Sequence, residues 1–194
     1  MGALFSSGEL PQEIFHRVQR SLSAPRFAHT LRVVEAATAL ARTWKIQGEK
    51  AALAALLHDY ARDLPKNTLL KKGDEFGIIN LEIEERFPLL LHGPVGARLA
   101  QRDFQITDPD ILAAIHWHTT GRRQMSLLEK IIFLADYVEA GRDFPGVDKV
   151  RQLVHVDIDQ GLLLALNQSI VYIIQRGWPL HPQTVEARNH ILNP

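Results

Sequence analysis

Cysteine is absent from this chain of 194 residues. Its absence excludes a disulfide scaffold, an iron–sulfur cluster, a thiolate zinc site and a cysteine nucleophile. A metal ion bound by this protein must therefore be held by histidine and carboxylate side chains. Histidine is comparatively abundant, with nine copies along the chain.

An excess of either charge is also missing, because 22 basic side chains balance 22 acidic ones. This balance excludes the large positive field of a dedicated nucleic-acid-binding protein. We therefore expect no nucleic-acid partner.

Long hydrophobic runs are missing as well. The apolar run at residues 51–57 is far shorter than the ~20 residues that span a bilayer. Residues 1–10 lack a basic segment followed by an apolar core, which a secretory signal would have. These observations favour a cytoplasmic protein with no membrane partner.

The chain length favours one domain, since domains average about 150 residues. Apolar residues recur at steps of three and four, the spacing that lines one side of a helix. No useful window alternates apolar and polar residues as a strand would. The pattern predicts an all-α bundle in a single domain over residues 1–194, with helices over 11–22, from 25 to before 48, 50–60, 65–72, from 94, 111–118, 130–138 and 157–175, a final short helix after 182, and irregular or short helical structure over 77–92.

Capping residues mark several of these helix ends. Asp108 predicts an N-cap, and Ser126 with Glu129 three residues later predicts a capping box. Gly73 and Gly121 are each expected to end a helix.

Three ionisable residues lie in or directly after apolar runs that should be buried. His58 and Asp59 follow the apolar run at residues 51–57, and Asp136 lies within the apolar helix predicted at 130–138. Burying such groups costs several kcal/mol unless they are paired or bind a metal. An isolated carboxylate at position 136 therefore needs a cation.

Three further histidines complete a set with metal-binding chemistry. His29 lies in an apolar helical stripe, whereas His92 and His118 stand beside turn residues. His116 lies roughly 200° around the helix from His118, so the two imidazoles cannot enter one site; we prefer His118 because it stands at the helix end. Mixed imidazole and carboxylate ligands from His29, His58, Asp59 and Asp136 suit a hard or borderline metal ion.

The order Arg26-x-x-His29, His58-Asp59 and a distant Asp136 resembles that of HD-domain metal-dependent phosphohydrolases. A narrower resemblance is to the YqeK family of symmetrical bis(5′-nucleosyl)-tetraphosphatases. It covers residues 25–184 and is carried by the strings HDYARDLP (58–65), LLHGPVGA (90–97), AIHWHTTG (114–121), LEKIIFLADYVEAGRDFPGV (128–147) and HPQT (181–184).

This resemblance implies an HD-domain helical bundle that hydrolyses diadenosine tetraphosphate at its centre to give two ADP. It implies a metal shell of His29, His58, Asp59 and Asp136. The metal in the family is often iron, and Mn, Mg, Co or Zn would suit the same divalent or trivalent site. A homodimer is a further implication.

The resemblance also assigns roles around the metal. His92 and His118 match positions that face the phosphates or ligate a second metal, and Asp59 would orient the attacking water. Guanidinium groups grip phosphate oxygens through a planar fork, which suits an anionic polyphosphate. The implied substrate-binding residues are Arg26, Arg62, His92, His118, Thr119 and Arg142, with His181 and Thr184 near a nucleoside.

Three other functions fit parts of this pattern. Another HD phosphohydrolase acting on nucleotides would share the metal shell. A nucleotide-sensing module would bind ligand at the metal without turnover. A structural helical protein would pair its buried ions and hold no metal.

Overall fold

The structure is a computed structural model that describes residues 11–193. Helices and no strands make up the regular structure of this part of the chain, which confirms the all-α prediction. The expectation about residues 1–10 falls outside the described residues. The helices are α1 (Gln12–Ser21), α2 (Ala24–Thr43), α3 (Gly48–Leu57), α4 (Lys66–Glu75), α5 (Glu82–Arg86), a 3₁₀ turn η1 (Pro88–Leu91), α6 (His92–Phe104), α7 (Pro109–Trp117), α8 (Leu127–Val138), α9 (Val147–Leu153), α10 (Ile158–Gln175) and α11 (Pro182–Leu192).

The centre of the bundle is built on α3, which packs against α2, α7 and α8. Small alanine side chains let the neighbouring helices approach α3 closely, and its leucines fill the space between them. Leu53, Leu56 and Leu57 are fully buried. Because α3 is apolar on nearly every side, it is a core helix, as the sequence predicted.

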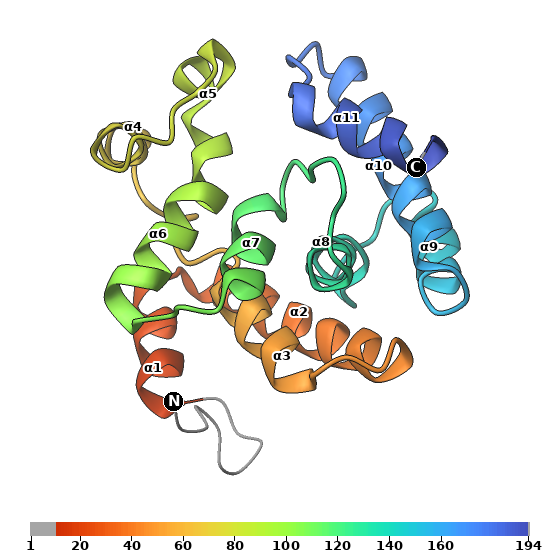
Figure 1. Cartoon of the computed structure of the whole chain (residues 1–194), viewed down its shortest axis with the longest axis horizontal. Helices are drawn as coiled ribbons and strands as arrows, with labels where there is room; N and C mark the ends of the chain where they lie inside the picture. Colours follow the sequence, from red (N-terminus) through yellow and green to blue (C-terminus); the bar gives the residue numbers. More distant parts are fainter. Residues whose placement is uncertain (1–10, 194) are drawn as a thin grey trace.

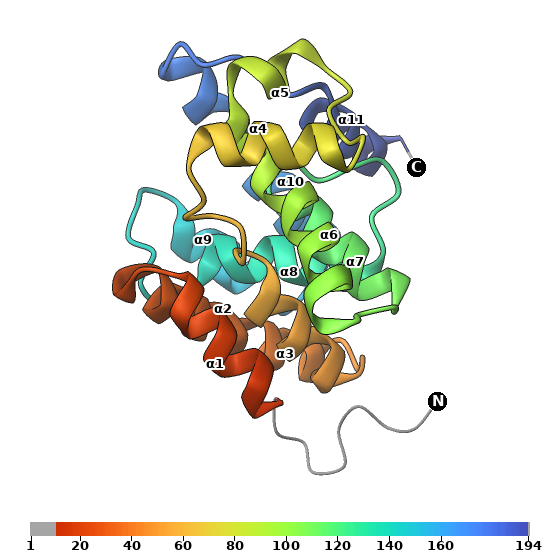
Figure 2. The same ribbon diagram turned by 90° about the vertical axis from the view of Figure 1, so that its left-hand side faces the viewer.

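Two arms rise from this centre (Figure 1). One contains α4, α5 and the start of α6, and the other contains α10 and α11. A turned view places α4 and α5 across the top of the molecule, above α6 and α8 (Figure 2). In this view α7 and α8 lie between α6 on one side and α9 and α10 on the other.

Several helix ends follow the predicted capping chemistry. The side chain of Asp108 accepts a hydrogen bond from the Asp110 backbone N–H and caps α7. Ser126 and Glu129 form the predicted reciprocal capping box at the start of α8. Helix α7 ends at Trp117, before the predicted stop at Gly121, and Gly121 follows the intervening turn with a φ of +64°.

Three predicted boundaries differ from the structure. The helix expected to reach residue 60 ends at Leu57, so His58 and Asp59 lie in the turn that follows α3. Gly73 was expected to end a helix but lies inside α4, where a Cβ atom would come within 2.9 Å of Ile79. Its role is to permit close packing, not to end the helix. The helix expected from Pro94 begins two residues earlier, at His92.

Helix α9 was not predicted. It has only seven residues, and two of them, Val147 and Val150, are buried. So short a stretch gives too few repeats for a periodicity to stand out.

No described helix is both long enough and apolar enough to cross a bilayer.

Candidate metal centre

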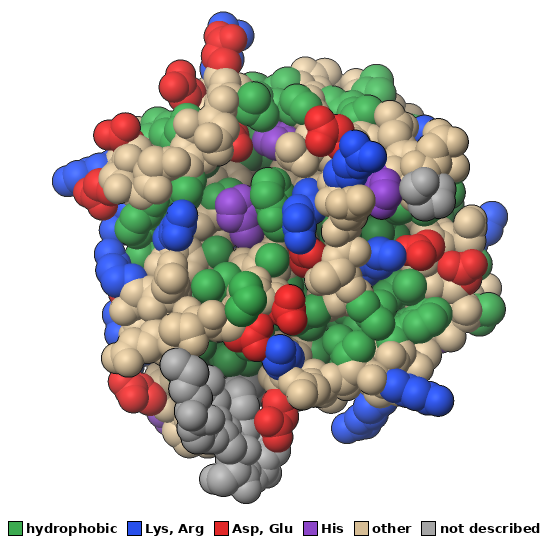
Figure 3. Space-filling model, viewed as in Figure 1, with side chains coloured by type: hydrophobic (Ala, Val, Ile, Leu, Met, Phe, Trp, Pro, Cys, Tyr) green, Lys and Arg blue, Asp and Glu red, His purple; other side chains and the backbone are tan. Residues whose placement is uncertain are grey.

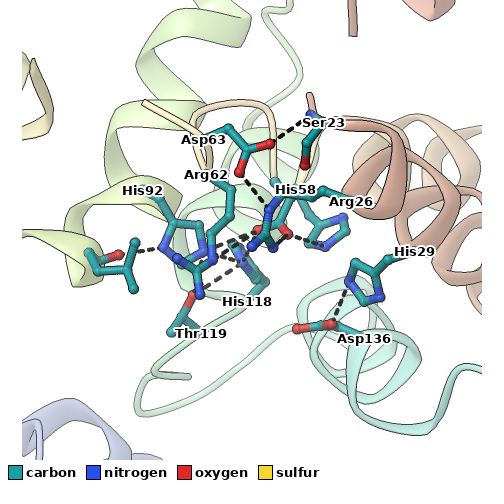
Figure 4. A network of polar contacts seen from close by, with 12 residues as sticks. Ser23, Arg26, His29, His58, Arg62, Asp63, His92, His118, Thr119 and Asp136 are labelled. Carbon is teal, nitrogen blue, oxygen red and sulfur yellow. Dashed lines mark hydrogen bonds and ion pairs between the residues drawn. The ribbon is translucent and has the colours of Figure 1, made fainter. Parts of the chain in front are cut away.

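Four imidazoles and two carboxylates converge between the arms of the bundle (Figure 4). They come from α2, the turn after α3, the start of α6, the end of α7 and the last turns of α8. Their donor atoms form three overlapping groups of three residues. Within each group, the donor atoms all lie within 4.8 Å of one another. The groups are His29–His58–Asp59, His58–His118–Asp136 and Asp59–His92–His118.

Three of the imidazoles are held by backbone carbonyl groups three residues earlier in the chain. A carbonyl oxygen can only accept a hydrogen bond, so each Nδ1 must be the protonated ring nitrogen. Each Nε2 is then left facing the centre. The Nδ1 atoms of His58, His92 and His118 donate to the carbonyl oxygens of Ala55, Leu89 and Ile115 at 2.6, 2.5 and 2.7 Å.

The donor set fits a metal ion. The Nε2 atom of His58 is buried without a hydrogen-bond partner, which costs free energy unless a ligand uses its lone pair. Two ligand atoms at right angles, each about 2.1 Å from one ion, lie about 3.0 Å apart. The Nε2 atoms of His92 and His118 are separated by 3.0 Å, as are His29 Nε2 and Asp136 Oδ1.

Asp59 lies between the imidazoles and the arginines. Its Oδ1 is 3.2 Å from His92 Nε2, and its Oδ2 is 3.1 Å from a terminal nitrogen of Arg26. Burial opposes ionisation of this carboxyl group, but His58, His118 and His92 outweigh burial and hold its pKa well below the ordinary value. Asp59 is therefore an anion, with Oδ1 facing the imidazoles and Oδ2 facing Arg26.

Asp136 pairs with residues from two directions. Its Oδ1 lies 3.0 Å from His29 Nε2 and 2.5 Å from a terminal nitrogen of Arg142. Burial raises the pKa of Asp136, but the hydrogen bond from His29 and the nearby charge of Arg142 lower it far more. The carboxylate that the sequence left in need of a cation thus has Arg142 beside it.

The imidazoles differ in how readily they take a proton. Burial lowers the pKa of His58 to about 4 and also lowers the pKa of His92. Burial acts in the same direction on His118, but its hydrogen bond and charge interaction with Asp59 raise the pKa of this imidazole overall. His58 and His92 are therefore neutral near pH 7, as metal ligands must be.

A second layer of polar contacts orients the first. The Nε atom of Arg26 donates to Asp63 at 2.9 Å, and Asp63 also accepts from the backbone N–H of Ser23. His29 Nδ1 lies 3.1 Å from Glu139, a buried carboxylate that Arg32 contacts as well. Burial raises the pKa of Glu139, whereas hydrogen bonds from Arg32, Gly141 and His29 lower it below the ordinary value.

A pocket of about 220 Å³ adjoins the centre. Its polar wall consists of His118, Thr119, Asp136, Arg142 and Ser169, and its apolar wall of Phe133, Tyr137 and Phe144. The space-filling view shows histidine and basic side chains reaching the surface in the middle of this face, with acidic side chains just below them (Figure 3). The arrangement offers cations for an anionic group and aromatic rings beside it.

The family model of the HD domain matches residues 26–141 of this chain, which contain every donor in the cluster. The chain belongs to the HD domain family. It is similar to the symmetrical bis(5′-nucleosyl)-tetraphosphatase of Bacillus subtilis (strain 168), with 37% identity over 94% of this chain and 97% of the relative. The Halalkalibacterium halodurans protein of the same name is 40% identical over 90% of this chain and 93% of its own length.

A solved structure also resembles this chain. It is described as the crystal structure of a predicted HD superfamily hydrolase involved in NAD metabolism from Clostridium acetobutylicum. The two chains share 39% identity and a TM-score of 0.90, covering 93% of this chain and 95% of the other. The HD-domain fold predicted from the sequence is confirmed.

The HD domain brings most of the predicted site residues together. Besides the six clustered donors, Thr119 Oγ1 lies 3.2 and 3.1 Å from the Nε2 atoms of His92 and His118. Arg62 approaches Asp59 at 4.0 Å. His116 lies outside the cluster, which agrees with the preference for His118.

His181 and Thr184 lie outside the residues that the HD domain model matches. Both are buried at the start of α11. The Nδ1 of His181 accepts a hydrogen bond from the Gln183 backbone N–H, and its Nε2 is 3.6 Å from Glu84 of α5. The contacts of His181 therefore join the two arms and do not reach the metal donors directly.

Sequence reasoning missed three residues of the second layer: Arg32, Asp63 and Glu139. One signal was available for Glu139, since it follows Asp136 by three residues and a helix places such residues on one side. No local pattern marks Asp63 as the partner of Arg26, because the two are 37 positions apart.

Proposed function

We propose that this chain is a metal-dependent hydrolase that cleaves diadenosine tetraphosphate symmetrically to two ADP. The observation that carries the proposal is the convergence of six metal-ligand donors beside a pocket with both cationic and aromatic walls. The names of the similar bacterial proteins supply the substrate class. We further propose that residues 1–194 act as one domain.

We assign the metal to His29, His58, Asp59 and Asp136. Iron is our proposed ion, although Mn, Mg, Co and Zn accept the same ligands. When bound, the metal supplies positive charge to phosphate oxygens and makes water acidic enough to yield hydroxide near neutral pH. In a form with two ions, His92 and His118, together with Asp59, would hold the second ion, and His118 would then carry no proton at Nε2.

The arginines bind and orient the phosphates. Arg26 uses two of its three guanidinium nitrogens on Asp63 and Asp59, and Arg142 uses two on Asp136. Each guanidinium keeps a third nitrogen whose N–H groups can donate to a phosphate oxygen. Arg62 and Thr119 face the same region.

The reaction forms a bond between a water oxygen and one inner phosphorus and breaks the central P–O–P bridge. Asp59 orients the water by accepting one of its hydrogen bonds. His118, whose Nε2 faces the centre and whose pKa is raised, can hold a proton beside the developing charge of the leaving ADP. The unprotonated Nε2 of the neutral His92 lies 3.0 Å from His118 Nε2 and can accept a hydrogen bond from that proton.

The pocket beside Asp136 and Arg142 suits one nucleoside. Aromatic rings provide surface against which a base can stack, and Tyr137 is fixed by a 2.7 Å hydrogen bond to Gln168. We place the second nucleoside toward His181 and Thr184. We also propose that the protein works in the cytoplasm as a homodimer.

Product analysis tests the function. Purified, metal-loaded protein incubated with diadenosine tetraphosphate should give ADP as the only nucleotide product. AMP plus ATP would mean asymmetric cleavage and would overturn the proposal. Release of product from mononucleotides alone would favour another HD phosphohydrolase, and tight binding without product would favour a sensing module.

Metal analysis addresses the structural alternative. A protein with internally paired ions predicts no stoichiometric metal after purification, whereas the hydrolase predicts at least one ion per chain. Size-exclusion chromatography with light scattering measures the oligomeric state.

A further inference from the structure

We propose that Glu139 is a positioning residue, which holds the imidazole of His29 so that Nε2 faces the metal. The inference rests on the metal role assigned to His29 in the proposed function. Glu139 Oε1 lies 3.1 Å from His29 Nδ1, while His29 Nε2 lies 3.0 Å from Asp136 Oδ1. The ring thus lies between one carboxylate behind it and another in the centre.

His29 needs such a partner because its own helix offers none. It lies inside α2, where backbone carbonyl groups accept the hydrogen bonds of the helix itself. The other three imidazoles lie at the ends of helical segments, and each donates to a carbonyl three residues earlier. The partner of His29 comes from a residue 110 positions away in the sequence.

Glu139 is itself held in place. Its Oε2 accepts hydrogen bonds from Arg32 Nε at 2.5 Å and from the Gly141 backbone N–H at 2.6 Å. Its side chain is only 2% exposed. Arg32 lies one turn after His29 on α2, so this helix contacts Glu139 at two points.

Glu139 and Asp136, which contact opposite sides of the His29 ring, come from the same short segment. Glu139 directly follows α8, and Asp136 is three residues earlier in the last turn of that helix. One turn of chain therefore supplies both the carboxylate in the centre and the carboxylate behind the ring. Such outer partners fix the tautomer and orientation of a metal-bound histidine.

The substitution Glu139→Gln separates positioning from packing. A carboxamide has nearly the same shape as a carboxylate but a single acceptor oxygen. Two N–H donors, from Arg32 and Gly141, compete for that oxygen against one from His29. We expect the amide nitrogen to face His29 Nδ1, so the imidazole loses its acceptor.

The chain offers a matched control in Glu129→Gln. Glu129 is buried at the other end of α8, and like Glu139 it accepts from an arginine and from a backbone N–H. Those partners are Arg122 and Ser126, and none of the centre's histidines contacts Glu129 within hydrogen-bond distance. Both variants should lose comparable thermal stability.

The measurement is Mn²⁺ binding to metal-stripped protein, followed by the EPR signal of the free ion. Glu139→Gln should raise the dissociation constant about 10- to 100-fold relative to wild type. Glu129→Gln should leave it within about threefold, the change that a stability loss distant from the site would produce. Thermal unfolding of both metal-free variants shows whether they are folded.

The outcomes are distinct. Unchanged Mn²⁺ affinity in a folded Glu139→Gln protein would overturn the positioning role and leave the proposed function intact. Equal weakening by Glu129→Gln would also overturn it, because the loss would then follow from destabilised packing. Wild-type protein that binds no Mn²⁺ and yields no ADP would overturn both proposals.

Discussion

The two sides of the metal centre are built by different means. On one side, His58, His92 and His118 are each oriented by the backbone of their own segment. On the other, His29 and Asp136 are oriented by side chains, through Glu139 and Arg142. Figure 4 shows His29 and Asp136 at one side of the cluster and His92 at the other.

This difference determines which substitutions can change the orientation of an imidazole. A ring held by a backbone carbonyl cannot be released by replacing another side chain, so the orientation of these rings should respond only to changes in helix position. A ring held by a carboxylate can be released by one substitution. We therefore expect the two sides to fail in different ways, and four variants test this.

The largest effect should come from Asp59→Asn, which acts where the backbone-held imidazoles meet. The amide lacks the negative charge that binds a metal and pairs with Arg26. We expect turnover of diadenosine tetraphosphate to fall at least about 100-fold, the upper limit for loss of an outer-layer partner. Circular dichroism should show that the helices remain. Activity near the wild-type level would remove Asp59 from the centre.

Gly93→Ala tests whether the backbone-held side responds to helix position. A Cβ atom at position 93 would lie 2.6 Å from the backbone oxygen of His116, a contact that no side-chain rotation can relieve. Helix α6 must then shift against α7 and separate His92 from His118. We expect a loss of about 1–3 kcal/mol in the free energy of unfolding, together with weaker metal binding. A stability loss with unchanged metal affinity would contradict the idea that helix position sets this side.

His116→Gln tests whether the imidazole of His116, unlike that of His118, lies outside the metal centre. Burial lowers the pKa of His116 to about 4, below the ordinary value of 6.5. Because the unfolded chain binds this proton more readily, His116 stabilises the fold fully above about pH 6.5, and this contribution falls as the pH drops toward 4.

The variant should therefore lose less stability than wild type between pH 6.5 and 4. We expect a difference on the order of 2 kcal/mol, which chemical unfolding at several pH values would measure. Metal content and turnover at pH 7.5 should match wild type. Loss of metal would place His116, and not only His118, in the centre.

The smallest effect should come from Asp108→Ala, at the end of α7 remote from His118. Asp108 caps this helix and lies 2.6 Å from Lys50 Nζ. Removal of a capping side chain costs about 1 kcal/mol. Burial raises the pKa of Asp108, but Lys50 and the cap lower it below 3.8 overall, so the stability difference should persist above pH 4 and shrink at lower pH. Metal affinity should not change; a large loss would mean that the cap positions His118 through the whole helix.

Much of the centre could be predicted because its donors break local rules. His58 and Asp136 interrupt apolar runs, and a buried ionisable group without a partner is costly in any fold. The ends of helices were less predictable. The residues 58–63 form a turn that a run of alanine and leucine does not reveal. Gly73 acts through a close contact with Ile79, which depends on how the segment after α4 folds back onto that helix.

The sequence alone determined that the protein is helical, that its metal ligands could not include thiolate, and that His58, Asp59 and Asp136 needed partners. Only the tertiary structure decided which partners they have. Arg26 meets Asp63 across 37 positions, and His29 meets Glu139 across 110, because the packing of α2 against α3 and α8 brings these residues together. Periodicity records which side of a helix is buried, but the identity of the residue across the interface is a property of the fold.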